Sequence, residues 1–319
     1  MITVLTGGTG GAKFIDGLRR VVPEQELTII VNTGDDMTWW GLYVSPDVDS
    51  VMYMLAGTLS QERGWGVKGD TFFCLQAMAN LGEPNWFHVG DRDLATHIFR
   101  SRLLAEGKTL SAATAEISAR LGVQVRILPM TDSQVETRVL TPAGELSFEE
   151  YFVQRWFQDP VESVRFAGAE QAKPAPGVIE AIRSSELVLV APSNPVTSIG
   201  PILAVPGIRE ALRESSARTA AVSPIVGKAA VSGPAGALMA AQGFEVSIAG
   251  IAACYADFLD LLVVDSEDAV GAQKLSQAGL RVRCAPIIMR RNEDRVALAK
   301  STVEACREYT AADTAGERA

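Results

Sequence analysis

A glycine-rich turn near the N-terminus has the composition of a phosphate-binding loop. It reads Gly7-Gly8-Thr9-Gly10-Gly11-Ala12-Lys13, between an apolar, β-branched run at 2–6 and a helical pattern that begins near Phe14. Glycines allow a tight turn and a close approach of the backbone to a ligand. The free N–H groups at the start of a helix attract anions. The turn therefore predicts a site for a phosphorylated ligand such as a nucleotide, with these binding residues: Gly8, Thr9, Gly10, Gly11 and Lys13.

The turn departs from both common nucleotide-binding motifs. A dinucleotide-binding turn has a third glycine where this sequence has Lys13, and an acidic residue after the second strand, where this sequence has Asn32-Thr33-Gly34. A P-loop lysine lies between a glycine and a serine or threonine, whereas Lys13 lies between Ala12 and Phe14. These departures disfavour an NAD-dependent oxidoreductase, which stays as an alternative together with a turn that binds no ligand.

Four carboxylates follow the second expected strand within fifteen residues: Asp35, Asp36, Asp47 and Asp49. Proteins bind Mg²⁺ through one or two carboxylates together with phosphate oxygens and water. Aspartates close to a phosphate loop therefore predict a magnesium site that draws on these four residues. The alternative is structural, because aspartates are common in turns and as helix caps, and Asp47 lies at the start of a helical pattern.

A second polar loop follows the most apolar strand-like run of the chain, at 187–191. It reads Pro192-Ser193-Asn194-Pro195 and continues to Ser198. Ligands of α/β proteins lie beyond the C-terminal ends of the strands. We therefore expect Ser193 and Asn194 to contact the phosphate or base, and Ser198 to cap a helix that faces the phosphate. A helix cap and turn without a ligand is the alternative.

Strand-like and helical runs alternate along the chain, which predicts an α/β fold. The runs at 187–191 and 261–264 are apolar on both faces, as in a parallel sheet covered by helices. Residues 60–165 contain more helix and a polar hairpin pattern at 136–147. We expect one nucleotide-binding domain over residues 1–319, a doubly wound, mostly parallel, Rossmann-like sheet with a helix-rich cap inserted at about 60–165.

Composition limits the classes of function. The 319 residues are 47% hydrophobic, as in a well-packed enzyme, and the net charge of −9 disfavours a nucleic-acid binder. There is no apolar run of about 18 residues, so we expect no membrane span. The N-terminus leads directly into a strand, so we expect no secretory signal. The four scattered cysteines fit reduced thiols in a cytoplasmic protein.

Nucleophilic side chains are arranged in no recognisable catalytic set. The sequence offers neither a Ser-His-Asp nor a Cys-His pattern, and we expect both His88 and His97 to be structural. We therefore predict no covalent protein intermediate and favour a direct, metal-assisted transfer. An aromatic residue can cover a flat heterocycle and an arginine can pair with a phosphate. Trp39 and Trp40, next to the aspartate pair, carry the first of these weaker signals, although tryptophan is more often a core residue. Arg92 in the expected cap carries the second, although it could equally pair with Asp91 or Asp93.

The segments occur in an order that resembles the 2-phospho-L-lactate transferase family of coenzyme F-420 biosynthesis. The similarity runs from residue 1 to at least residue 260, and the series of motifs carries it, not a single motif. Beyond the segments above, the series includes Pro46-Asp47-Val48-Asp49, Gly90-Asp91-Arg92-Asp93-Leu94-Ala95-Thr96-His97 and Ser223-Pro224-Ile225-Val226-Gly227-Lys228.

The resemblance implies a transfer between two substrates. A phosphorylated three-carbon acid, such as 2-phospho-L-lactate or phosphoenolpyruvate, passes from a guanosine diphosphate ester to the deazaflavin alcohol FO. The terminal ribityl hydroxyl of FO attacks the phosphorus next to the acid, GMP leaves, and F-420-0 or its dehydro form results. The resemblance also implies Mg²⁺ as cofactor and a homodimer.

The resemblance also implies roles for the candidate residues. A metal on Asp36 and Asp47, or on Asp35 and Asp49, would bridge the donor phosphates and activate the hydroxyl, with Asp36 and Asp47 as the catalytic pair. The glycine-rich loop, with Ser193, Asn194 and Ser198, would hold the donor nucleotide. The cap would cover FO with these residues: Trp65, Asp91 and Arg92.

The same superfamily contains a non-catalytic branch that resembles a nucleotide-sugar-binding regulator. The segment Gly90-Asp91-Arg92-Asp93 favours the transferase, because that branch lacks this arrangement. The identity of the three-carbon acid stays open, since one or two side chains can decide it.

Overall fold

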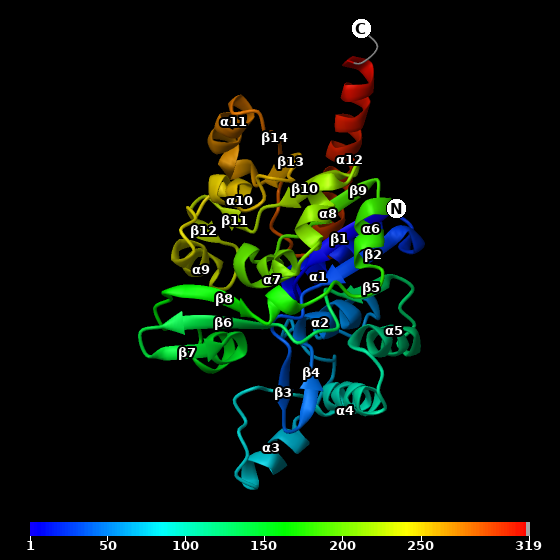
Figure 1. Ribbon diagram of the computed structural model, residues 1–319, viewed down its shortest axis with the longest axis vertical. Coiled ribbons are helices and arrows are strands. Elements are labelled where there is room, and N and C mark those ends of the chain that lie inside the picture. The colour runs from blue at the N-terminus through cyan, green and yellow to red at the C-terminus, as the bar shows by residue number, and fades with distance from the viewer. Residues whose placement is uncertain (317–319) are drawn as a thin grey trace.

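A seven-stranded parallel sheet forms the centre of the molecule (Figure 1). The computed structural model describes residues 1–316, with side chains to Glu308. In spatial order the strands of the sheet are β14 (Arg281–Cys284), β13 (Leu261–Val264), β10 (Arg218–Val222), β9 (Leu187–Val190), β1 (Ile2–Thr6), β2 (Leu27–Val31) and β5 (Arg126–Pro129). Every neighbouring pair is parallel; Val4, for example, is in register with Ile29 of β2 and Leu189 of β9. The doubly wound, Rossmann-like α/β fold is therefore confirmed.

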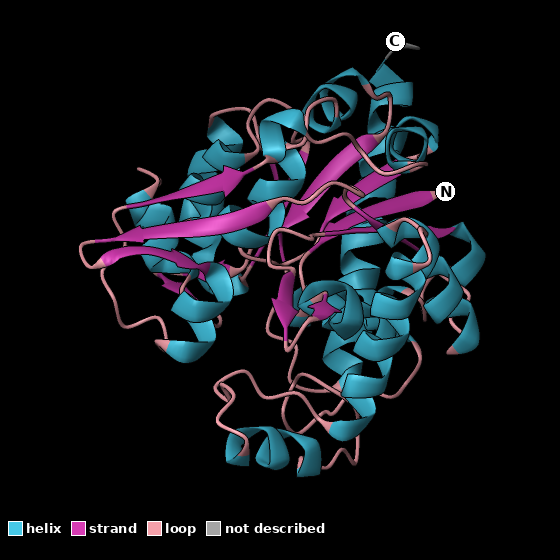
Figure 2. Cartoon of the chain, turned by 60° about the horizontal axis from the view of Figure 1, so that its bottom comes forward, coloured by secondary structure: helices cyan, strands magenta, loops and turns pink. Residues whose placement is uncertain are grey.

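Helices cover both faces of the sheet, because its strands are apolar on both sides (Figure 2). Alternate strand residues enter different cores: Val4 packs into one and Leu5 into the other. The first core includes α1 (Thr9–Leu18), α2 (Pro46–Leu55), α5 (Leu110–Arg120) and α12 (Asn292–Gly316). The second includes α6 (Val178–Ser184), α7 (Gly200–Ala204), α8 (Ile208–Glu214), α9 (Ala235–Ala241), α10 (Ile248–Cys254) and α11 (Ala269–Gln277).

Smaller elements extend from the sheet, on the side away from the C-terminal end of α12 (Figure 1). They are the hairpin of β3 (Met37–Trp39) and β4 (Leu42–Val44), α3 (Phe73–Asn80) and α4 (Asp91–Ala105). A separate antiparallel sheet contains β7 (Gly144–Ser147), β6 (Glu136–Thr141) and β8 (Ser163–Ala167). Strand β5, in the middle of residues 60–165, belongs to the main sheet. The parts of this range before and after β5 lie outside that sheet.

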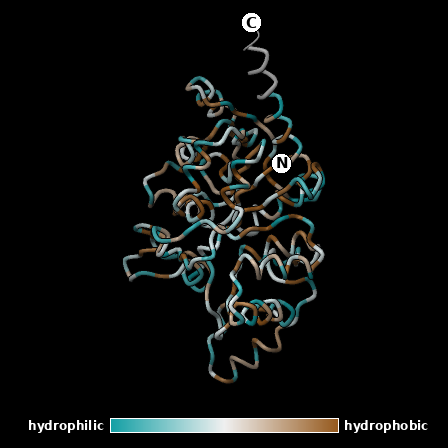
Figure 3. The backbone as a smooth tube through the Cα atoms, turned by 45° about the vertical axis from the view of Figure 1, so that its right-hand side comes forward, coloured by the Kyte–Doolittle hydropathy of each residue, from teal (hydrophilic) through white to brown (hydrophobic). Residues whose placement is uncertain are grey.

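Short helical turns and one further hairpin complete the chain. The 3₁₀ turns are η1 (Glu24–Glu26), η3 (Ala169–Gln171) and η5 (Ser266–Asp268), the π-helical turns are η2 (Glu150–Gln154) and η4 (Pro195–Ile199), and β11 (Ile225–Val226) pairs with β12 (Ala229–Ala230). Hydrophobic and hydrophilic residues are interspersed along the tube in Figure 3. Within the described part of the chain, no helix is both long and apolar enough to cross a membrane.

The strand order fixes where a ligand can bind. The chain moves from β1 outward to β2 and β5, then returns to β9 beside β1 and continues outward in the other direction. In open α/β sheets, ligands bind at the carboxyl ends of the strands where the order reverses. The loops that follow β1 and β9 therefore meet at the expected binding position.

Candidate functional site

The glycine-rich loop after β1 packs directly against the polar loop after β9. The backbone N–H of Gly7 donates to Ser193 Oγ at 3.2 Å. A Cβ atom at Gly10 would lie 2.8 Å from the carbonyl oxygen of Pro192, so this position admits only glycine. Helix α1 then begins at Thr9, which makes the loop a helix N-terminus, a favourable position for an anion.

The loop also packs against the first of the site's carboxylates. Asp47 lies in the first turn of α2, and a Cβ atom at Gly8 would lie 2.4 Å from its Oδ1. The backbone N–H of Gly8 donates to this carboxylate. Because Gly8 has no side chain, the glycine-rich loop can pack directly against the Asp47 carboxylate.

One buried amide connects two of the aspartates. Asn32 follows β2, and its Nδ2 donates to Asp35 Oδ2 at 3.0 Å and to Asp47 Oδ2 at 2.9 Å. The backbone N–H of Gly34 donates to Asn32 Oδ1 at 2.8 Å, which fixes the orientation of the amide. Asn32 thus holds two carboxylates from different elements close together.

Burial makes this cluster electrostatically unfavourable for negative charge. Burial, followed by the charges of Asp47 and Glu149, raises the pKa of Asp35 well above its ordinary value. Burial raises the pKa of Asp47 to about 6, against the opposing hydrogen bonds from Asn32 and Gly8. The pKa of Glu149 rises to about 8, through burial and then through the charges of Asp47 and Asp36. Within the described residues, no basic side chain pairs with Asp35, Asp47 or Glu149.

Two cavities adjoin at this cluster. The first, of about 540 Å³, has an aromatic lining that includes Trp65, Trp86 and Phe87. The second, of about 390 Å³, is the one that holds most of the predicted donor residues: Gly8, Thr9, Gly10, Lys13, Ser193, Asn194 and Ser198. The residues that line both cavities are Thr9, Asp35, Asp47, Phe148 and Phe152. An aromatic chamber and a phosphate-type chamber therefore meet at two carboxylates.

The family model described as 2-phospho-L-lactate transferase CofD matches residues 2–298. The chain belongs to this family. It is 45% identical over 316 residues to a phosphoenolpyruvate transferase of Streptomyces griseus, with 97% of this chain and 99% of that protein covered. It is 43% identical to a 2-phospho-L-lactate transferase of Methanococcoides burtonii, with 94% and 97% covered.

The fold also matches solved structures that are distant in sequence. A protein of the UPF0052 family from Bacillus halodurans superposes with a TM-score of 0.66 at 19% identity, covering 95% of this chain and 98% of that one. At this identity the likeness concerns the fold alone. The family match, by contrast, makes the chain a transferase of the CofD family.

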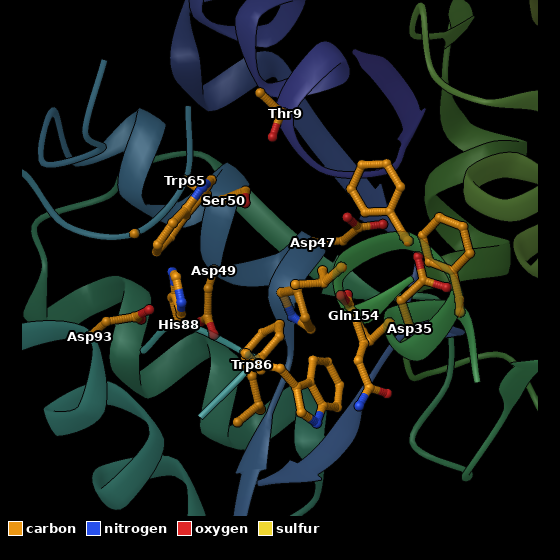
Figure 4. Close-up of a pocket in the computed structure, with 18 of the residues that line it drawn as sticks. Thr9, Asp35, Asp47, Asp49, Ser50, Trp65, Trp86, His88, Asp93 and Gln154 are labelled. Carbon is orange, nitrogen blue, oxygen red and sulfur yellow. The ribbon is translucent and has the colours of Figure 1, made fainter. Parts of the chain in front are cut away.

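In this CofD-family chain, the four predicted metal aspartates lie in three different places. Asp35 and Asp47 lie together on one side of the aromatic cavity, and Asp49 lies with Asp93 on the other (Figure 4). Asp36 lines neither cavity; its carboxylate accepts hydrogen bonds from Tyr43 at 2.9 Å and from Ser45 at 2.7 Å. Burial raises the pKa of Asp36 to about 8 against those two bonds.

Asp49 belongs to a buried network around a guanidinium group. Arg100 on α4 is fully buried and forms a bidentate ion pair with the Asp49 carboxylate. His97 Nδ1 lies 3.6 Å from Asp49 Oδ2, and its Nε2 lies 3.3 Å from Asp93 Oδ1, which also accepts from Tyr53. Candidate ligand atoms of Asp49, Asp93 and His97 lie within 4.8 Å of one another. The Arg100 guanidinium already pairs with Asp49, so part of the negative charge that a cation would meet in this group is neutralised.

The three residues expected to cover FO have different surroundings. Trp65 lines the aromatic cavity, and the Arg63 guanidinium lies 5.3 Å from the centre of its ring. Asp91 caps the start of α3 by accepting from the Cys74 N–H at 2.9 Å. Arg92 is exposed and donates to the Lys68 carbonyl at 3.1 Å. Asp91 and Arg92 line neither of the two cavities.

The remaining donor candidates also have local roles. Asn194 caps η4, its Oδ1 accepting from the Val196 N–H at 3.0 Å. Burial, followed by the charge of Arg295, lowers the pKa of Lys13. Gly11 lies against β1, where a Cβ atom would lie 1.7 Å from Thr6 Oγ1. Gly11 therefore permits the turn, whereas Lys13 supplies a cation to the cavity.

Several residues that build the site were not singled out by the sequence analysis. Asn32, Glu149 and Phe152 each depend on a contact between segments that are far apart in the chain. His97, expected to be structural, lies in the wall of the aromatic cavity. Asn32 at the end of β2 could have been singled out by its position, because strand ends beside the switch point face the ligand.

Proposed function

We propose that this chain transfers a phosphorylated three-carbon acid from a guanosine diphosphate ester to the deazaflavin FO, and releases GMP. The observation that carries the proposal is the meeting of a phosphate-type cavity and an aromatic cavity at Asp35 and Asp47. A transfer between two substrates requires two adjoining sites with the reacting atoms at their junction. The names of the relatives, 2-phospho-L-lactate transferase and phosphoenolpyruvate transferase, supply the transferred group.

The donor nucleotide occupies the smaller cavity. The N-terminus of α1 and the Lys13 ammonium group attract the diphosphate. Ser193 and Ser198 present hydroxyl groups to the same space. The flat ring system of FO occupies the larger cavity, between aromatic side chains.

A hard cation fits the junction between the cavities. Asp35 Oδ1 is buried and has no hydrogen-bond partner of good geometry within the described residues. Carboxylate oxygens are the protein ligands that Mg²⁺ prefers, and it commonly takes one or two of them with phosphate oxygens. Asp35 and Asp47 would hold Mg²⁺ here, and its chemistry is to neutralise charge on the donor phosphates.

The chain's residues then align the reaction. The FO hydroxyl oxygen bonds to the phosphorus next to the acid, the bond from that phosphorus to the bridging oxygen breaks, and GMP leaves with the electron pair. Glu149 lines the acceptor cavity and, in its deprotonated form, accepts the hydroxyl proton on a carboxylate oxygen. Such transfers depend on positioning and charge neutralisation more than on covalent help from the protein.

The test is an end-point assay with purified protein, FO and Mg²⁺. Lactyl, enolpyruvyl and glyceryl donors are offered separately, and products are identified by mass. Formation of an F-420 precursor together with GMP is the expected result, and the preferred donor identifies the acid. The absence of product with every donor, alongside tight binding of a nucleotide sugar, would overturn the proposal in favour of the regulator. Light scattering in the same preparation tests for the homodimer.

A further inference from the structure

Residues 148–157, here named the aromatic segment, form a stack of rings between the two cavities. The rings of Phe148 and Phe152 are parallel, with centroids 5.4 Å apart and planes 7° apart. The ring of Phe157 continues the stack, 5.5 Å from Phe152 with planes 17° apart. Phe148 and Phe152 line both cavities, whereas Trp156 and Phe157 line only the aromatic one. The stack is therefore a wall that the two cavities share.

The outer rings of the aromatic segment are unusually accessible for their type. Trp156 is 71% exposed, Phe157 is 42% exposed and Phe152 is 36% exposed. Large aromatic side chains gain most from burial. Rings that remain exposed at the edge of a cavity therefore retain contact area that a ligand can use.

The backbone holds these rings in place at an energetic cost. Trp156 and Phe157 have φ angles of 53° and 45°, in the left-handed region that bulky residues rarely adopt. The preceding turn, η2, is a π-helix, a rare form that often occurs at functional sites. Strained conformations persist where the surroundings determine them and where function uses them.

A buried side chain and hydrogen bonds hold the aromatic segment in place. The Tyr151 side chain is fully buried in the second core, and the Phe157 N–H donates to the Tyr151 carbonyl at 2.8 Å. Glu150 accepts hydrogen bonds from the N–H and hydroxyl of Ser147, at 2.8 and 2.9 Å. The outer rings are thus presented by an anchored turn.

A second set of rings lines the opposite side of the aromatic cavity. Trp65 and His88 lie across the cavity from Gln154, which belongs to the aromatic segment (Figure 4). The Trp65 ring also makes an edge contact with Phe72, at a centroid distance of 6.3 Å. The cavity therefore has aromatic walls on two sides, which suits a flat, fused heterocycle.

We propose that Phe152 and Trp156 act as an aromatic clamp that selects the flat heterocycle of the acceptor, and that Phe152 also contacts the nucleotide in the donor cavity. This assignment rests on the proposed function for the identity of the acceptor. The two rings have different duties, because Phe152 lines both cavities and Trp156 lines one. Stacking on such side chains tolerates any ring with a π face, so selection concerns flatness and size.

The clamp is tested by direct binding, with FO and GDP as separate probes titrated into the full chain. Trp156→Ala should weaken FO binding by about tenfold or more and leave GDP binding unchanged. Phe152→Ala should weaken both, and Trp156→Phe should restore most of the FO affinity. Phe73→Ala is the matched control, since Phe73 is 76% exposed and lines neither cavity. Circular dichroism and light scattering establish folding and oligomeric state for each variant.

Each outcome separates the clamp from the proposed function. FO turnover by the wild type, with FO affinity of Trp156→Ala within twofold of the control, overturns the clamp and leaves the transferase. FO binding that depends on Trp156, without turnover of any donor, retains the clamp and overturns the transferase. A change of oligomeric state in Trp156→Ala with unchanged FO affinity would assign the exposed rings to self-association and overturn the clamp.

Discussion

Replacing Asp35 by asparagine should stabilise the metal-free protein and inactivate it. The change is nearly isosteric, and the new amide oxygen can still accept the hydrogen bond that Asn32 Nδ2 gives to Asp35 Oδ2. The negative charge disappears from a place where burial and the carboxylates of Asp47 and Glu149 oppose it. Folding of the variant therefore does not bury a negative charge at this position. The Mg²⁺ ion of the proposed function, however, would lose one of its ligands.

The size of the effect follows from the geometry around Asn32. The nearest oxygens of Asp35 and Asp47 bond to the same nitrogen at 3.0 and 2.9 Å. Two hydrogen bonds from one amide group leave those oxygens about 5 Å apart, and two unit charges at that separation repel by about 3 kcal/mol at an effective dielectric constant of about 20. The gain corresponds to a rise in melting temperature of roughly 5 °C. Loss of a charge that the transition state uses should lower turnover by about 100-fold or more.

The assay is thermal unfolding at pH 8.5 in EDTA, followed by turnover of the same preparations with Mg²⁺. Asp36→Asn is the matched control, because Asp36 follows directly in the sequence but lines neither cavity. Burial raises the pKa of Asp36 to about 8 despite its hydrogen bonds from Tyr43 and Ser45, so this replacement should also raise the melting temperature in EDTA, and turnover is the readout that separates the two variants. Turnover of the control should fall by less than about tenfold.

Two results would refute this account of Asp35. A melting temperature below that of the wild type in EDTA would mean that the Asp35 charge is stabilising in the folded state. Turnover of Asp35→Asn equal to that of Asp36→Asn would remove Asp35 from the reaction. Either outcome would also weaken the assignment of the cation to the junction of the cavities.

Four further predictions concern pH, metal binding, the glycine-rich loop and the helix cap. Because the folded-state pKa values of Asp47 (about 6) and Glu149 (about 8) are raised, the folded protein holds these protons longer than the unfolded chain; stability in EDTA should fall as pH rises from 4 to 8. Added Mg²⁺ should raise the melting temperature more at pH 8 than at pH 5, since ligands bind it deprotonated; an equal rise would contradict this. Gly8→Ala should lower turnover by about 100-fold, because its Cβ would displace the Asp47 carboxylate, whereas Gly236→Ala on α9 should leave turnover unchanged. Equal turnover of the two variants would contradict the contact between Gly8 and Asp47. Asp91→Asn should lower the melting temperature and leave the KM for FO unchanged, because Asp91 caps α3; a raised KM would return Asp91 to the acceptor site.

The main sheet could be predicted because its signal is local. Runs such as 187–191 are apolar on both faces, and only a parallel sheet between helices buries both. The strand β14 lacks this signal, because two of its four residues are arginines and the strand lies at the sheet edge. The π-helical turn η2 and the left-handed backbone at Trp156 follow from tertiary packing, for which the sequence contains no periodic pattern.

The segments that form the candidate site could be predicted from the sequence, but not which of their residues lie together. The loops after β1 and β9 were expected at the same end of the sheet, and Gly7 does bond to Ser193. The four aspartates looked equivalent because they are close in sequence, yet Arg100 of α4 captures Asp49 and the β3–β4 hairpin captures Asp36. Such a division depends on side-chain contacts made in the folded chain, one of them with Arg100, 51 positions from Asp49, and the spacing of the aspartates alone cannot reveal these contacts.

The junction is also where the choice of acid should be decided. Overall similarity does not separate the donors, because relatives named for phosphoenolpyruvate and for 2-phospho-L-lactate share 45% and 43% identity with this chain. In the proposed reaction the acid is attached to the phosphorus that reacts, so we expect it to lie where both cavities share residues. Thr9 and Phe148 are the shared residues that are neither acidic nor part of the clamp. Saturated and unsaturated three-carbon groups differ little in size, so discrimination should be within the 10- to 200-fold range typical of small apolar differences. Substitution of Thr9 or Phe148 should therefore change the ratio of kcat/KM values between donors, whereas substitution of Trp156, which lines only the acceptor cavity, should lower both values together.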